Sequence, residues 1–124
     1  RLRFVDGEPW SLSTTWLPDD LGAVTLHADL RDRSLYALLA EHGIRAVAGV
    51  RSAEAAIADE TQGPLLRTGV GQPLLVLRSV SFDENDRPIE AFVAYHRGDR
   101  SRFEFRLSAS PTDLKTAELR HTGL

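Results

Sequence analysis

The sequence contains no cysteine and no methionine, and only 7% of its 124 residues are aromatic. Without cysteine, neither a disulfide framework nor a zinc site built on thiolates is possible. Translation starts with methionine, so a chain that begins at Arg1 and contains none is expected to be either a processed chain or a domain of a longer protein. We expect the second case, and we interpret the function of this chain as one domain's share of a larger activity.

Long apolar runs and an excess of one charge are also missing. The longest apolar runs, such as residues 74–77, fall far below the roughly 20 residues that span a bilayer, and no secretory signal is visible. The formal net charge is -3, from 15 Lys and Arg against 18 Asp and Glu. A mildly acidic domain lacks the basic surface of an autonomous nucleic-acid binder, so DNA contact is expected to come from a part outside this chain.

What is present is the composition of an ordinary globular domain. Hydrophobic residues make up 42% of the chain and charged residues 27%. A chain of 124 residues is long enough to bury one core and too short for two ordinary domains. We therefore expect a single domain over residues 1–124.

Alternating side chains and turn residues predict a mostly antiparallel sheet. The first two strands are expected to form a hairpin around Gly7, with one apolar and one polar face. From residue 108 onward the periodicity is lost. Strands are expected over residues 1–5, 10–17, 44–58, 74–82, 89–97 and 103–107.

Helical signals are fewer. Ser34 is a suitable N-cap for the run 35–42, whose leucines recur at helical spacing, and Gly43 stands where helices commonly end. A shorter helix is expected within residues 59–67, and residues 18–33 are expected to be irregular. One clear helix beside a largely antiparallel sheet defines an α+β fold class.

Motifs of catalysis and cofactor binding are absent from the sequence. There is no GxSxG nucleophile elbow, no GxGxxG or GxxxxGK phosphate-binding loop, and the four histidines do not fall at metal-ligand spacing. We therefore expect no catalytic residues, no bound metal and no cofactor.

A few polar side chains are candidates for a small-molecule site. Arg1 and Arg3 share a strand face, and arginine suits bidentate recognition of a carboxylate or phosphate, although solvated surface charges would look the same. Ser34 places a hydroxyl at a helix start, where a simple N-cap is the alternative. Glu90 offers an acceptor for hydroxyl or amine groups, and His96 shares its strand face, which is also consistent with a merely polar sheet face.

The order and spacing of several segments resemble the UTRA domain, the effector-binding domain of HutC-type regulators in the GntR family of bacterial transcription factors. No single segment is specific, but together they cover residues 1–107 in the family's order. The segments are RxRxxDGxP at 1–9, LP at 17–18, SLYxLL at 34–39, PLLVLRSVSFD at 73–83, RPIE at 87–90 and YHRGDRSRFEF at 95–105.

The resemblance implies a chorismate-lyase-like α+β fold, with a central antiparallel sheet, a few flanking helices and a ligand cleft. It implies a cytoplasmic sensor that is no enzyme, binds a small-molecule effector and forms a homodimer. A winged helix-turn-helix domain upstream of this chain would contact operator DNA, and the effector would control that contact allosterically. No membrane partner is implied.

The resemblance also assigns residues to the anionic end of the ligand. Arg1 and Arg3 match the paired arginines that hold the anionic group in members that bind sugar phosphates. Ser34 and Tyr36 match the serine and tyrosine of the SLY loop, which contact the same ligands.

At the other end of the ligand the match is weaker. Glu90 matches the glutamate after the arginine-proline turn, but Ser13 stands where many members have glutamate, and His96 where a tyrosine is usual. We therefore expect an anionic ligand such as a sugar phosphate or a carboxylate, without a finer identity. The family's RGDR pattern implies an ion-paired turn that closes the sheet, formed by Arg97, Asp99 and Arg100.

Two other functions remain open at this stage. A small lyase-like enzyme with the same fold, acting on a carboxylate substrate, would share the sheet and its cleft. An interaction module that has lost its ligand would share the fold alone.

Overall fold

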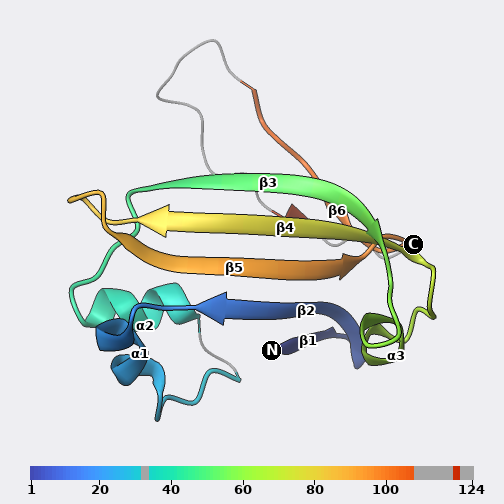
Figure 1. The fold of residues 1–124 in the computed structure, drawn as a ribbon, viewed down its shortest axis with the longest axis horizontal. Helices are drawn as coiled ribbons and strands as arrows, with labels where there is room; N and C mark the ends of the chain where they lie inside the picture. Colours follow the sequence, from blue (N-terminus) through green and yellow to red (C-terminus); the bar gives the residue numbers. More distant parts are fainter. Residues whose placement is uncertain (32–33, 108–118, 121–124) are drawn as a thin grey trace. The chain divides into compact units, whose positions relative to one another are not determined.

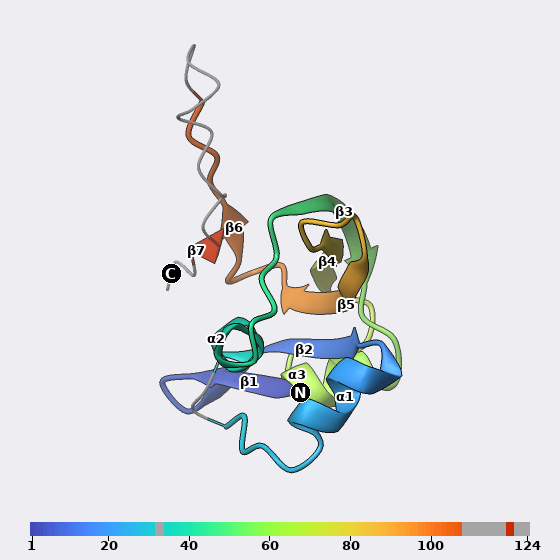
Figure 2. The same cartoon turned by 90° about the vertical axis from the view of Figure 1, so that its left-hand side faces the viewer.

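The computed structural model describes residues 1–31, 34–107 and 119–120 of the chain. Its main sheet has five strands in the order β1-β2-β5-β4-β3, with neighbours antiparallel (Figure 1). A second, two-stranded sheet pairs β6 with β7 (Figure 2). The strands are β1 (Leu2–Val5), β2 (Glu8–Trp16), β3 (Ala48–Ile57), β4 (Pro73–Phe82), β5 (Pro88–Arg97), β6 (Arg102–Phe103) and β7 (Leu119–Arg120).

Three helices accompany the strands in the described part of the chain: α1 (Asp19–Thr25), α2 (Leu35–Glu41) and α3 (Gln62–Leu66). The α+β class and the antiparallel sheet are therefore confirmed, as are the helices expected after Ser34 and within 59–67. The strand expected over 103–107 is wrong beyond Phe103, where β6 ends. The aperiodic tail expected from residue 108 lies outside the described residues, apart from β7.

Helix α1 corrects the expectation that residues 18–33 are irregular. Pro18 stands at the N-cap, and Asp19 and Asp20 occupy the first turn, where negative charge interacts favourably with the helix dipole. The helix is hard to recognise because Gly22 and the β-branched Val24 and Thr25 are weak helix formers. Burial of Leu21 against the core supplies the stability that propensity does not.

The hairpin of β1 and β2 turns at Asp6 and Gly7, which both have positive φ (50° and 79°). The expected hairpin is present, with Leu2 opposite Leu12 in the register. Its expected division into an apolar and a polar face is wrong, because Ser11 is buried and Trp16 is 55% exposed. The alternation along β2 therefore does not separate core from solvent.

By backbone contacts the described chain falls into two units. The second unit comprises Ser13–Ala53 and Leu77–Ala94. Its core joins Leu21 of α1, Leu39 of α2 and Ile89 of β5, and α1 and α2 lie side by side (Figures 1 and 2). The partly buried side chains around this core are Leu17, Leu35 and Ile44.

The first unit comprises Arg1–Leu12, Glu54–Val76 and Tyr95–Leu124. Its buried apolar side chains include Trp10, Ala58, Leu66, Leu74 and Val76. Where β5 ends, the amide of Gly98 donates a hydrogen bond to the carbonyl of Pro73 at 2.9 Å. A Cβ at position 98 would lie 2.6 Å from that carbonyl oxygen, so only glycine permits this approach.

We expect Gly98→Ala to lower the free energy of unfolding by about 2 kcal/mol, because the backbone of Pro73 has to move away from the added methyl group. The matched control is Gly22→Ala in α1, where nothing lies within 4 Å of the added Cβ. That change is expected to raise stability by roughly 0.5–1 kcal/mol through helix propensity. Urea denaturation measures both. Equal stability of Gly98→Ala and wild type would contradict the close approach.

Candidate functional site

A cluster of polar side chains lies within the second unit, where α2 meets β4 and β5. The hydroxyl oxygens of Tyr36 and Ser81 are 3.2 Å apart. Either hydroxyl can donate this hydrogen bond. Tyr36 also interacts with the carboxylate of Glu90, and this interaction influences the pKa values of both groups. The structure thus brings together two of the site residues expected from the sequence, Tyr36 and Glu90.

Glu90 is the acidic residue of this cluster, and only 5% of its surface is exposed. Its Oε2 atom is buried and accepts no hydrogen bond from the residues that the structure describes. Burial raises the pKa of Glu90 above the usual glutamate range, against the opposing effects of the Tyr36 hydrogen bond and the charge of Arg51. A buried acceptor without a hydrogen-bond partner lowers the stability of the fold, so a hydrogen-bond donor placed at Oε2 of Glu90 would be stabilising.

Tyr36 links this carboxylate to the sheet. Burial is the main cause that raises the pKa of Tyr36, the hydrogen bond from Ser81 lowers it, and the hydrogen bond to Glu90 raises it. The side chain remains 39% exposed, so its ring lies at the surface while its hydroxyl reaches inward to Ser81 and Glu90. Tyr36 therefore stands between solvent and the buried carboxylate.

The sequence did not point to Arg51, Ser79, Ser81 or Phe92 as members of this cluster. Ser79 and Ser81 are both buried and alternate along β4, which places them on one face. The Nε atom of Arg51 donates to the Ser79 hydroxyl at 3.4 Å, and its Cζ atom lies 5.3 Å from the centre of the Phe92 ring. Two serines at alternate positions of a largely apolar strand were the available signal.

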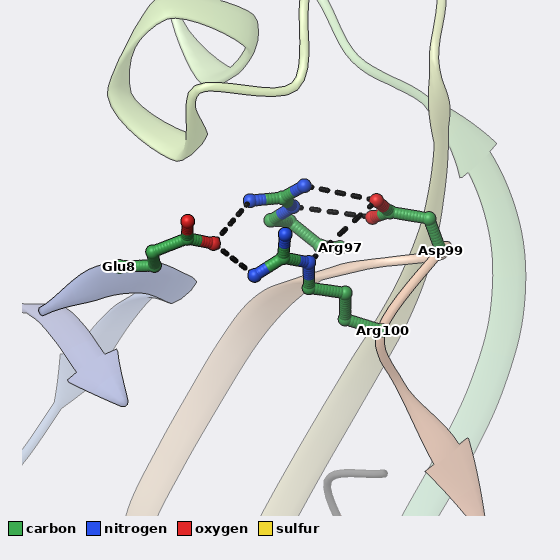
Figure 3. A network of polar contacts seen from close by, with 4 residues as sticks. All are labelled: Glu8, Arg97, Asp99 and Arg100. Atoms are coloured by element: carbon green, nitrogen blue, oxygen red, sulfur yellow. Dashed lines mark hydrogen bonds and ion pairs between the residues drawn. The ribbon is translucent and has the colours of Figure 1, made fainter. Parts of the chain in front are cut away.

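In the first unit, a network of ion pairs surrounds Arg97 (Figure 3). Two nitrogens of Arg97 donate to the carboxylate of Asp99, at 3.1 and 2.9 Å. On the other side, Oε2 of Glu8 on β2 lies 3.7 Å from Nη1 of Arg97 and forms an ion pair with Arg100. The network therefore ties the start of β2 to the turn after β5. Glu8 was missed in the sequence, because 92 positions separate it from Arg100.

The Arg97 side chain is 9% exposed, so its positive charge has little contact with water. The carboxylates of the network stabilise this buried charge. The Arg97 hydrogen bonds are the main cause that lowers the pKa of Asp99 below the usual aspartate range. Asp99 and Glu8 are half exposed, so solvent weakens each pair. These contacts give the residues 97–100 an architectural position at the end of the sheet.

The remaining site residues expected from the sequence are distributed over both units. In the first unit, Arg1 precedes β1, Arg3 lies opposite Ser11 in the β1–β2 register, and both side chains are exposed. His96 is buried in β5 with its ring edge-on to Phe103, 6.0 Å between centroids. In the second unit, Ser13 is half-buried on β2, and Ser34 is the N-cap of α2 without a capping hydrogen bond from its hydroxyl. A shared anion site of Arg1, Arg3 and Ser34 stays a prediction.

Metal-binding clusters and membrane-spanning helices are both absent from the described ranges. Residues 1–31, 34–107 and 119–120 hold no group of three or more His, Asp or Glu side chains placed to bind a metal ion. No helix in the same ranges has the length and apolar character needed to cross a membrane.

Comparisons with known proteins identify the class. Over 103 residues the chain is 31% identical to the HTH-type transcriptional repressor PhnF of Mycolicibacterium smegmatis, an alignment that covers 83% of this chain and 42% of that protein. The crystal structure of the PhnF effector domain superposes with a TM-score of 0.78 at 31% identity, covering 84% of this chain and 64% of that one. A GntR-family regulator from Enterococcus faecalis V583 gives a TM-score of 0.70 at 28% identity, covering 86% and 76%.

The chain therefore has the structure of the effector domains of GntR-type transcriptional regulators. A family model described as the UTRA domain matches residues 1–102, and the chain belongs to the UTRA domain family. Two of the curated relatives are named as transcriptional repressors. The chain spans 42% of the length of the first curated relatives that it matches.

The raised pKa of Glu90 predicts a pH-dependent stability. Because the folded chain holds the Glu90 proton more tightly than the unfolded chain, ionisation costs stability as the pH rises from about 4.3 through the raised pKa. Glu90→Gln removes this titration. We therefore expect the variant's free energy of unfolding, relative to wild type, to increase over that pH range and then to level off.

Urea denaturation at a series of pH values measures this difference. The control Glu60→Gln makes the same substitution at an exposed glutamate outside the cluster. A Glu90→Gln difference that is flat or falls with rising pH would show that burial does not penalise the charged form.

Proposed function

We propose that this chain is the ligand-sensing and dimerisation domain of a bacterial transcriptional regulator of the HutC subfamily. Its effector is a small anionic metabolite, a sugar phosphate or a carboxylate. In the whole protein, which acts in the cytoplasm, an N-terminal winged helix-turn-helix domain binds operator DNA. Effector binding shifts the arrangement of the DNA-binding domains and so controls operator affinity. The domain itself performs no catalysis.

The observation that carries this proposal is the buried carboxylate of Glu90. A side chain that served packing alone would be apolar or fully hydrogen-bonded, whereas Oε2 of Glu90 accepts no bond from the described residues. A ligand with a hydroxyl or amine would supply the donor. The neighbouring Tyr36 is partly exposed and matches the family's SLY tyrosine, which supports a role for both residues in one ligand site.

The anionic end of the ligand is assigned to Arg1, Arg3 and Ser34. Both arginines are exposed, and each guanidinium group offers five N–H donors to an anion. Ser34 presents its hydroxyl at the N-cap of α2. The support for this assignment is the match of these positions to the family's paired arginines and SLY serine, with charge-assisted hydrogen bonds as the physical basis. Ser13 and His96, where the chain departs from the family pattern, would contact the rest of the ligand.

We expect the double variant Arg1→Ala, Arg3→Ala to weaken binding of the tightest effector by at least about a hundredfold. Each charge-assisted hydrogen bond contributes about 1.5–3 kcal/mol, and two of them are lost. The effector is first selected by a thermal-shift screen of sugar phosphates, amino acids and small carboxylates. Isothermal titration calorimetry then measures the dissociation constants of wild type and variant.

The matched control is the double variant Arg45→Ala, Arg106→Ala, which removes the same charge from two other exposed positions. It is expected to bind the effector within a factor of about two, since only long-range electrostatics change. Unchanged affinity of the Arg1→Ala, Arg3→Ala variant would overturn the assignment of the anionic end. A screen without any ligand would favour an interaction module instead.

Dimerisation is supported by the edge of the main sheet. β3 is the terminal strand in the sheet order and carries large apolar side chains in solvent. Val50 is 70% exposed and Ile57 is 71% exposed. An exposed apolar edge strand is a template for pairing with another chain.

We expect sedimentation equilibrium at tens of micromolar to give twice the chain mass of 13.7 kDa. Val50→Glu should shift the mass toward the monomer, because the charge would be buried in the interface. Leu26→Glu, at a 76% exposed position outside β3, is the control and should leave the dimer intact. A monomeric wild type would refute dimerisation by this domain alone.

A further inference from the structure

The polar cluster of the second unit contains a positive charge that the family resemblance does not assign. Arg51 lies on β3, next to β4 in the sheet, and contacts Ser79 of β4 and Phe92 of β5. Glu90 and Phe92 are two positions apart on β5 and therefore share a face. Arg51 thus lies over the face of the sheet that also carries Glu90.

The guanidinium of Arg51 is positioned but not neutralised. Its Nε donates to Ser79, and its plane is held near the Phe92 ring, 5.3 Å from Cζ to the centroid. No carboxylate of the described residues forms an ion pair with it, and its terminal nitrogens make no hydrogen bond in the same part of the chain. A planar guanidinium with its terminal N–H groups available is suited to an oxyanion.

The strand that carries Arg51 is fixed against its neighbour. A Cβ at Gly49 would lie 2.9 Å from the carbonyl oxygen of Val80, so the β3 backbone approaches β4 as closely as glycine allows. Gly49 is two positions before Arg51 on the same face. The guanidinium therefore projects from a strand that is held against β4 rather than from a loop.

Arg51 and Glu90 also act on each other through space. The charge of Arg51 lowers the pKa of Glu90 against the larger effect of burial, yet no ion pair joins the two side chains. Glu90 has a buried acceptor without a donor, and the exposed Arg51 has terminal N–H groups that bond to no described residue. A ligand that supplied a donor to Glu90 and an acceptor to Arg51 would satisfy both groups on one face of the sheet.

We infer that Arg51 and Glu90 form a two-point recognition site, in which the ligand presents an oxyanion to Arg51 and an O–H or N–H group to Glu90. This inference rests on the proposed ligand-sensing function and narrows its chemistry. The ligand class is a small carboxylate or phosphate ester that bears a hydroxyl or amino group beside the acid. This site places the oxyanion at Arg51, as an alternative to its placement at Arg1, Arg3 and Ser34.

The test uses small probes that carry both groups or only one. Lactate joins a hydroxyl to a carboxylate, propionate has only the carboxylate, and propane-1,2-diol has only hydroxyls. Glycerol 3-phosphate, inorganic phosphate and glycerol form the corresponding phosphate set. Dissociation constants for the 124-residue chain are measured by two-dimensional NMR titration, which detects binding in the millimolar range.

We expect lactate or glycerol 3-phosphate to bind with a dissociation constant below about 10 mM, and at least about tenfold more tightly than its separate parts. Arg51→Gln should weaken binding of that bifunctional probe about tenfold or more and leave the diol or glycerol within about twofold. Arg51→Lys should restore part of the affinity. Whichever set binds identifies the oxyanion as carboxylate or phosphate.

The control Arg45→Gln removes an exposed arginine charge six positions before Arg51 and should bind as wild type does. If neither bifunctional probe binds below about 10 mM, or if Arg51→Gln binds it as wild type does, the two-point site is wrong. The proposed function is tested separately. It is retained after such a result if the thermal-shift screen yields an anionic effector whose affinity depends on Arg1 and Arg3. Near-UV circular dichroism establishes that each variant is folded.

Discussion

Arg97 carries a permanent positive charge into the interior of the first unit, and that charge is tolerable only because carboxylates meet it from two directions. Asp99, in the turn after β5, accepts two hydrogen bonds from Arg97, and Glu8 approaches Arg97 from the beginning of β2 (Figure 3). Removing one partner of such a pair costs more than the pair contributes, because the remaining charge stays buried. The end of β5 and the first hairpin therefore form one structural element.

In the second unit, a single strand contributes both to the apolar core and to the polar cluster. Ile89 belongs to the apolar core with Leu21 and Leu39, whereas the next residue, Glu90, belongs to the polar cluster. Neighbouring residues of a strand point to opposite faces of the sheet, so Ile89 and Glu90 lie on opposite faces of β5. Under the proposed function, substitutions on the polar face would alter ligand preference while the core of this unit stays intact.

The sequence predicts the elements of this fold best where the signal is local. Gly7 and Gly43 stand at turns with positive φ, and the leucine spacing after Ser34 yields α2. Helix α1 was missed because its stability comes from the burial of Leu21, which local propensity does not report. The strand expected beyond Phe103 was wrong because alternation indicates a strand only where a partner strand pairs with it.

The candidate site was predicted only in part for a similar reason. Tyr36 was named through the family's SLY motif, and Glu90 was named both as a hydrogen-bond acceptor and through the motif after the arginine-proline turn. Arg51 and its partner Ser79 are separated by 28 positions and belong to no such motif. Glu8 likewise meets Arg100 only through the sheet. Pairings across strands depend on register, and register is a property of the folded sheet rather than of any one segment.

The buried Oε2 atom of Glu90 gives the cluster a chemical preference. An ionised carboxylate only accepts hydrogen bonds, and this atom accepts none from the described residues. A ligand atom that offers only lone pairs at Oε2 would meet repulsion there, and relieving it would require Glu90 to take up a proton. A ligand site at this atom would therefore distinguish an alcohol or amine from a ketone or ether of the same shape, a discrimination by proton count rather than by size.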